Sequence, residues 1–192
     1  MLALRLSLVL LLTASVAAAQ DMPSPQAMQL QVQKIAQERP REAEAAARAF
    51  LHLVAPDRIG GLDSLKAAAP DAYWMEVAQL TVQFDVVQKL TQRDSTRAAL
   101  VTQMFGTEVQ ARAQQRAYRV ATEARRAAIR TQIEALITKH FELEDRLRTL
   151  EIADIERRLA DVRAETARRR EKRAEFVRWT VDDILRDAVR PQ

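Results

Sequence analysis

The chain has 192 residues, of which only three are glycine and none is cysteine, and its formal net charge at pH 7 is +4. Charged residues make up 29% of the chain and aromatic residues 5%. Sheet proteins need turn residues at strand ends and β-branched or aromatic residues between them, so this composition argues against sandwiches, barrels and α/β folds. The abundant residue types (Ala, Leu, Arg, Gln and Glu) favour helices. The composition therefore predicts an all-α protein.

Residues 1–19 have the pattern of a signal peptide. Arg5 gives a positive start, residues 6–12 are predominantly apolar, and the three alanines at 17–19 suit cleavage. The apolar stretch is too short for a membrane-spanning helix, which needs about 20 apolar residues. Since the chain has no cysteine, there is no lipobox to acylate. We expect an exported protein, periplasmic or extracellular, soluble and not a cysteine-anchored lipoprotein.

Prolines and glycines divide the part that follows into short segments. A disordered leader is expected at 20–25, where two prolines oppose regular structure. Short helices are expected at 26–38, 41–54 and 62–69, with Pro40 and the stretch from Pro56 to Gly61 as breaks. A better amphipathic helix is predicted at 71–92, and another from residue 96 with Asp94 or Ser95 as its N-cap. Residues 26–106 are thus predicted to form a helical N-terminal region.

The second half of the chain is predicted to be a long helical or coiled-coil region. Residues 107–190 contain neither glycine nor proline. One interpretation is a single long C-terminal amphipathic helix. The other is a helical hairpin with a break near Thr122, whose hydroxyl could cap a new helix. Both alternatives predict coiled-coil character.

Apolar residues in this region predict a protein interface. They recur at steps of three and four, which places them along one side of a helix, and the phase of the pattern shifts near residues 150–152. We expect this surface to serve self-association or the binding of another envelope protein. The predicted interface residues are Ile133, Leu136, Leu143, Leu147, Leu150, Ile155, Leu159 and Val162.

The sequence contains no catalytic pattern. It has neither a G-x-S-x-G elbow nor a glycine-rich phosphate loop. We predict no catalytic residue, no cofactor and no enzymatic activity. The candidate metal ligands are His140 and Glu144, which are four residues apart and so share one side of a helix. The competing interpretation of His140 is a polar interruption of the apolar seam that fixes its register.

A basic cluster follows the apolar region. Its functional interpretation is contact with an anionic surface such as phospholipid headgroups, and its competing interpretation is a solvated helix balanced by neighbouring acids. The modest net charge and the export signal argue against a nucleic-acid partner. The cluster consists of Arg168, Arg169, Arg170, Lys172 and Arg173.

Together these features predict an exported, non-enzymatic coiled-coil interaction or structural protein of the cell envelope. The alternative is a periplasmic holdase-type chaperone, or an accessory protein of the envelope-stress or metal response. In size, export signal and helical content the chain resembles exported helical chaperones of the Spy/CpxP kind and the coiled-coil chaperone Skp. The LTxxQ-type motif of the first group has no match here, so the resemblance assigns no functional residue.

Overall fold

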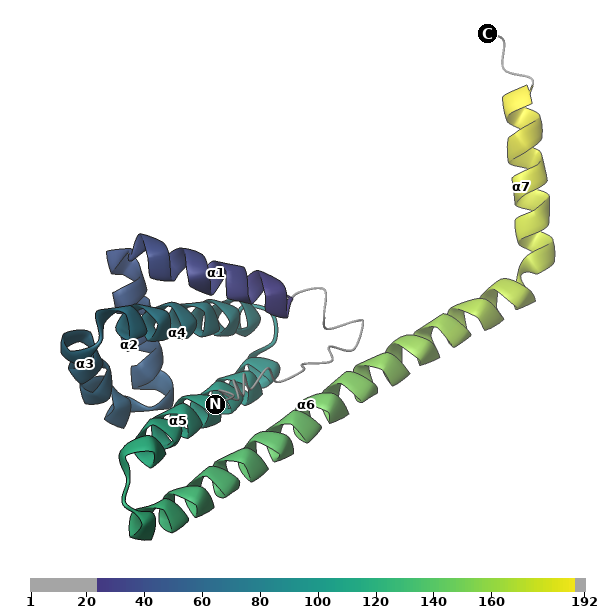
Figure 1. The fold of residues 1–192 in the computed structure, drawn as a ribbon. Coiled ribbons are helices and arrows are strands. Elements are labelled where there is room, and N and C mark those ends of the chain that lie inside the picture. The colour runs from purple at the N-terminus through teal and green to yellow at the C-terminus, as the bar shows by residue number, and fades with distance from the viewer. Residues whose placement is uncertain (1–23, 189–192) are drawn as a thin grey trace, which may run out of the picture. The chain divides into compact units, whose positions relative to one another are not determined.

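The computed structural model describes residues 24–188 (Figure 1). Every regular element within these residues is a helix, which confirms the all-α prediction. The predicted signal peptide and residues 20–23 of the predicted leader lie outside the described part. The chain divides into two compact units between Thr149 and Leu150, and each is treated separately below.

Prolines set the starts of the N-terminal helices. Pro25, Pro56 and Pro70 each occupy the first turn of an element, where the missing N–H has no partner to lose. Helix α1 begins inside the predicted leader, with the Ser24 hydroxyl accepting a hydrogen bond from the backbone N–H of Ala27. The elements are α1 (Pro25–Glu38), α2 (Arg41–Val54), the 3₁₀ turn η1 (Pro56–Arg58), α3 (Ile59–Ala68) and α4 (Pro70–Thr91).

The break expected over residues 56–61 is present at its start, but it does not extend to the glycine pair. Gly60 and Gly61 lie in the first turn of α3, and neither has a positive φ. The helical chain is interrupted earlier, at Ala55 and the η1 turn that Pro56 begins. The reason is that glycine tolerates helical angles at a modest cost, whereas proline removes a backbone donor and cannot be accommodated in a helix interior.

Helix α4 is the centre of the N-terminal unit. It contacts α1, α2, α3 and α5, as Figure 1 shows. Its buried residues point to several sides of the helix, which is the pattern of a helix covered all round. The fully buried ring of Phe50 on α2 lies with its centroid 6.0 Å from that of Phe84 and 6.2 Å from that of Phe105.

Helix α5 (Ser95–Val120) begins at the predicted cap, where Asp94 Oδ1 accepts the backbone N–H of Arg97 at 2.9 Å. It continues through Gly106, so the boundary predicted between residues 106 and 107 falls inside this helix. Ala121 then adopts an extended conformation with ψ 146°, and α6 (Glu123–Glu171) follows. The helical run from residue 107 is therefore interrupted near Thr122, as one of the two sequence interpretations requires.

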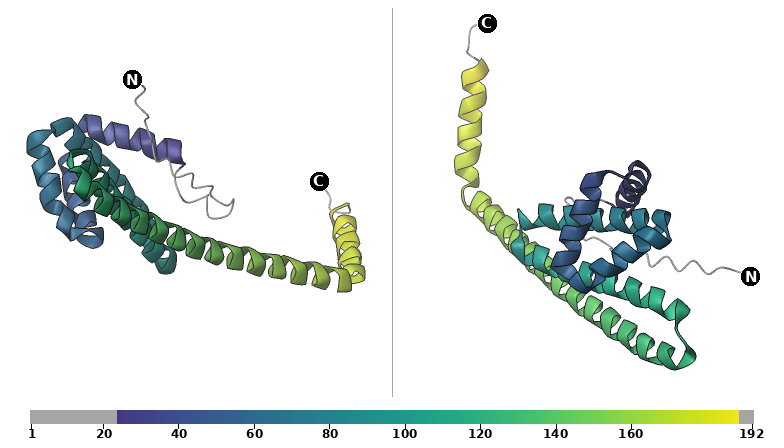
Figure 2. Two further views of the ribbon diagram at one scale, coloured as in Figure 1. Left: turned by 60° about the horizontal axis from the view of Figure 1, so that its bottom comes forward. Right: turned by 90° about the vertical axis from the view of Figure 1, so that its left-hand side faces the viewer.

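The second unit contains the end of α6 and helix α7 (Arg173–Ala188), which are separated by a turn at Lys172. Figure 2 shows α6 as a continuous helix in both views. No residue between 150 and 186 is buried. This unit therefore has no apolar core among its described side chains.

Candidate functional site

Three helices of the N-terminal unit each contribute one buried polar side chain. These are Gln83 on α4, Thr107 on α5 and His140 on α6, with 3%, 5% and 4% of their surface exposed. A buried polar group is costly unless it is hydrogen-bonded. The partners of these three residues therefore define the most constrained polar region of the described chain.

The hydrogen bonds of Thr107 fix the tautomer of His140. The Thr107 hydroxyl donates its single hydrogen to the carbonyl of Met104, with 2.6 Å between the oxygens. It must then accept from His140 Nδ1, which lies 2.9 Å away. When the imidazole is neutral, its lone pair is therefore on Nε2, and that atom is buried without a hydrogen-bond partner among the described residues.

Glu108 links the buried side-chain amide of Gln83 to neighbouring charged side chains. Gln83 Nε2 donates to Glu108 Oε2 at 3.0 Å. Burial raises the pKa of the Glu108 carboxyl above its ordinary value, while the nearby charge of Arg112, that of His140 and the Gln83 hydrogen bond act in the opposite direction. Arg112 lies 3.7 Å from both Glu108 and Glu76. The cluster thus connects α4, α5 and α6 by hydrogen bonds and charges.

The two predicted metal ligands, His140 and Glu144, bond to different partners in the structure. His140 uses Nδ1 for Thr107, and Glu144 Oε1 accepts a hydrogen bond from Arg148 Nη2 at 2.7 Å. Among residues 24–188 no group of three or more His, Asp or Glu side chains is placed to hold a metal ion. In the structure His140 therefore makes a structural hydrogen bond and Glu144 an ion pair.

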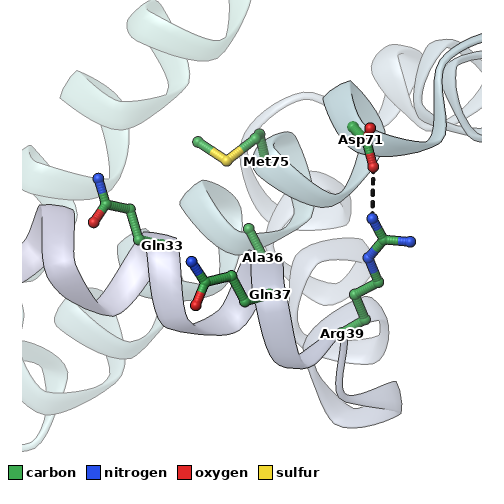
Figure 3. Close-up of a pocket in the computed structure, with 6 residues that line it drawn as sticks. All are labelled: Gln33, Ala36, Gln37, Arg39, Asp71 and Met75. Atoms are coloured by element: carbon green, nitrogen blue, oxygen red, sulfur yellow. Dashed lines mark hydrogen bonds and ion pairs between the residues drawn. The ribbon is translucent and has the colours of Figure 1, made fainter.

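The N-terminal unit also has an open surface pocket between α1 and α4 (Figure 3). Arg39 and Asp71 form an ion pair at one side of it, 2.5 Å apart, and the Asp71 side chain is 91% exposed. Gln33, Gln37 and Met75 complete most of its lining. Its polar groups are solvent-accessible amides and a paired charge, which gives it no reactive group.

The predicted interface residues fall into three classes of exposure. Leu143 and Leu147 are buried, with 3% and 8% of their surface exposed. Ile133, Leu136 and Leu150 are half-buried. The remaining three are exposed by 46–62% and belong to the second unit: Ile155, Leu159 and Val162.

The second unit exposes further apolar side chains. Ile152 on α6 is 56% exposed, and α7 exposes six large apolar residues by 48–69%. These six are Phe176, Val177, Trp179, Val181, Ile184 and Leu185. Exposure of so many large apolar side chains in one segment is unusual for a monomeric protein.

The basic cluster lies between these two apolar surfaces, and all five of its side chains are exposed. Arg168 and Arg169 both pair with Glu165, at 3.4 Å and 3.1 Å. Part of the cluster's charge is thus balanced within the helix, and exposed pairs of this kind contribute little to stability.

None of the described helices is both long enough and apolar enough to cross a membrane. Comparison with protein-family models, with curated proteins and with solved structures finds no significant match to this chain.

Proposed function

We propose that this chain is a non-enzymatic interaction protein of the cell envelope, which binds another protein through the helical segment that begins at Leu150. A helical hairpin of α5 and the first part of α6 forms its base, and the segment after it acts as the docking arm. The single observation that supports the proposal is the exposure of ten large apolar side chains between Ile152 and Leu185 in a stretch with no buried residue.

The physical argument rests on what this exposure costs. Each large apolar side chain gains about 1.5–3 kcal/mol when it is fully removed from water. Four of the ten are spaced by three and four residues along α6, as in a coiled-coil seam. A partner helix is the simplest surface that covers such a seam. Coiled-coil pairing of the arm is therefore part of the proposal.

The test places a photoreactive amino acid at Leu159 in the full-length protein, inside the cells that produce it. Ala164, which is exposed on the same helix but lies outside the seam, is the matched control position. We expect discrete protein adducts from position 159 and none from position 164. Absence of adducts from both positions, or equal adducts from both, would refute the docking arm.

The identity of the adducts separates the alternatives. One adduct of defined mass supports a specific partner. A broad ladder of unrelated proteins from position 159 favours the holdase-type chaperone, whose clients are many. The exposure of basic and apolar side chains three positions apart, as at Arg173 and Phe176, supports this alternative.

A further inference from the structure

Helix α6 has an apolar seam that the rest of the described chain leaves uncovered. Ile152, Ile155, Leu159 and Val162 follow one another at steps of three, four and three residues. Their exposed fractions are 56%, 47%, 46% and 62%. This spacing is that of the a and d positions of a two-stranded coiled coil over two heptads.

The uncovered seam is a separate surface rather than the end of the buried one. Continuing the steps of Leu143, Leu147 and Leu150 leads to polar residues: Asp154, Arg157 and Asp161. The five-residue step from Leu147 to Ile152 turns the apolar side by about 140° around the helix, at about 100° per residue. The uncovered seam therefore needs a partner of its own.

When the a and d pattern is extended by two positions in each direction, its outermost residues have opposite charges. Counting back from Ile152 by four residues gives Arg148, and by three more gives Asp145. Counting forward from Val162 by four residues gives Thr166, and by three more gives Arg169. All of these positions belong to α6, so they share one side of a single helix.

These charges discriminate between the two ways of pairing α6 with a copy of itself. A parallel pair places each a or d residue beside its own copy. Asp145 would then face Asp145, and Arg148 and Arg169 would each face an identical arginine. Three layers would oppose like charges, which is destabilising at such positions.

An antiparallel pair removes all three conflicts. When Ile155 lies opposite the partner's Leu159, Ile152 lies opposite the partner's Val162, so all four apolar layers pair with apolar layers. In the same register Arg148 faces the partner's Thr166. Asp145 faces the partner's Arg169, and symmetry forms this ion pair twice. A shift by one heptad in either direction would place charged residues against the apolar ones.

We propose that the protein forms an antiparallel homodimer through α6, with Ile155 opposite Leu159 of the partner subunit. The paired seam runs from Asp145 to Arg169, about 36 Å at 1.5 Å per residue. Near the centre Glu156 and Arg158 each lie close to their own copies, which gives only a weak repulsion because these charges are exposed. This inference rests on the proposed docking arm and names its partner as a second copy of the chain.

Sedimentation equilibrium of the full chain without its first 19 residues tests the dimer. We expect a concentration-dependent dimer that Leu159→Asp weakens at least tenfold. The control Ala164→Asp introduces the same charge on the same helix, outside the seam, and leaves the dimer constant unchanged. Circular dichroism verifies that both variants keep their helicity. A wild-type chain that stays monomeric, or equal weakening by both substitutions, overturns the proposal.

Charge reversal tests the orientation. Asp145→Arg alone and Arg169→Asp alone each create two like-charge layers in the antiparallel dimer and weaken it, whereas the double variant restores it. In a parallel dimer each single reversal replaces one like-charge pair with another and changes nothing. Failure of the double variant to restore pairing, or single variants without effect, excludes the antiparallel register.

The absence of cysteine from the chain permits a direct check. Mixing an Asp145→Cys chain with an Arg169→Cys chain should give mixed disulfides faster than either chain forms its own, and the reverse order contradicts the register. Failure of the homodimer proposal can also be distinguished from failure of the docking-arm proposal. A monomeric chain whose Leu159 photoadduct contains a different protein refutes the homodimer and leaves the docking arm standing.

Discussion

Two stretches of helix α6 share the same apolar spacing and have opposite surroundings. Leu143 and Leu147 are 3% and 8% exposed, whereas Leu159 and Val162 are 46% and 62% exposed. In the first stretch the apolar side chains are covered by the chain's own N-terminal unit. In the second stretch no described residue is buried. Heptad spacing therefore identifies the apolar side of a helix but not the molecule that covers it.

Truncation of one leucine in each stretch should give the largest difference in the free energy of unfolding. Leu143→Ala should lower the free energy of unfolding by about 2–5 kcal/mol, because it removes buried methyl groups and leaves a cavity. Leu159→Ala should change it by no more than about 0.5 kcal/mol, because the side chain is already half in water.

Urea denaturation followed by circular dichroism measures both variants, at concentrations where the chain is monomeric. The two substitutions remove the same atoms from the same helix, so helix propensity cancels between them. Equal losses of stability would contradict the assignment of one leucine to the core and the other to an open surface.

The buried polar cluster gives the next effect. Thr107→Val removes the acceptor of His140 Nδ1–H and should cost about 1–3 kcal/mol, the penalty of a buried donor without a partner. His140→Leu should cost less, because the Thr107 hydroxyl keeps its hydrogen bond to the Met104 carbonyl. The double variant should lose less than the sum of the two single losses. Additive losses in this double-mutant cycle would mean that the two side chains do not interact.

Local signals predicted the helices well where proline or a cap sets the boundary. Pro40, Pro56 and Asp94 lie at helix boundaries as the sequence indicated. The prediction that the break extends to Gly60 and Gly61 failed because glycine destabilises a helix only modestly, and α3 forms in spite of that cost.

The core of α4 was only partly predictable. Val77 and Val87 lie on one side of the helix, as an amphipathic helix predicts, and Tyr73 lies on that same side, but Val82 and Val86 are also buried. Those two residues lie on the opposite side, which is covered because α4 has neighbours all round. A one-sided periodicity cannot reveal a helix that is surrounded.

The polar cluster had no local signal. Thr107 and His140 are 33 residues apart, and Gln83 and Glu108 are 25 apart. His140 stood out as a polar residue in the apolar seam, but Gln83, Thr107 and Glu108 each resemble an ordinary polar residue of a solvated helix. Only the fold brings the four together. The exposed seam was the reverse case, because its spacing was visible in the sequence while its exposure required the structure.

The smallest expected effect concerns pH and Glu108. Burial raises the pKa of this carboxyl above its ordinary value of 4.5, so the folded state holds the proton more tightly than the unfolded state does. The carboxyl of the unfolded chain therefore ionises first, and the folded state loses stability as pH rises through the interval between 4.5 and the raised pKa. Glu108→Gln removes this cost, and its amide oxygen can still accept the hydrogen bond from Gln83.

Thermal unfolding of the wild type and of Glu108→Gln between pH 4 and pH 8 measures the difference. The variant should gain Tm relative to the wild type as pH rises from 4, by at most about 2–4 °C, and the gain should then stay constant. Glu134→Gln is the matched control, since Glu134 is an exposed α6 residue paired with Arg130, and it should give no comparable trend. A Tm difference that does not change with pH would show that the charges of Arg112 and His140 balance the burial of Glu108, and a difference that favours the wild type as pH rises would show that those charges outweigh it. The polar cluster would then stabilise the N-terminal unit through ion pairing, and its difference from the exposed, ion-paired surface of α6 would be one of degree.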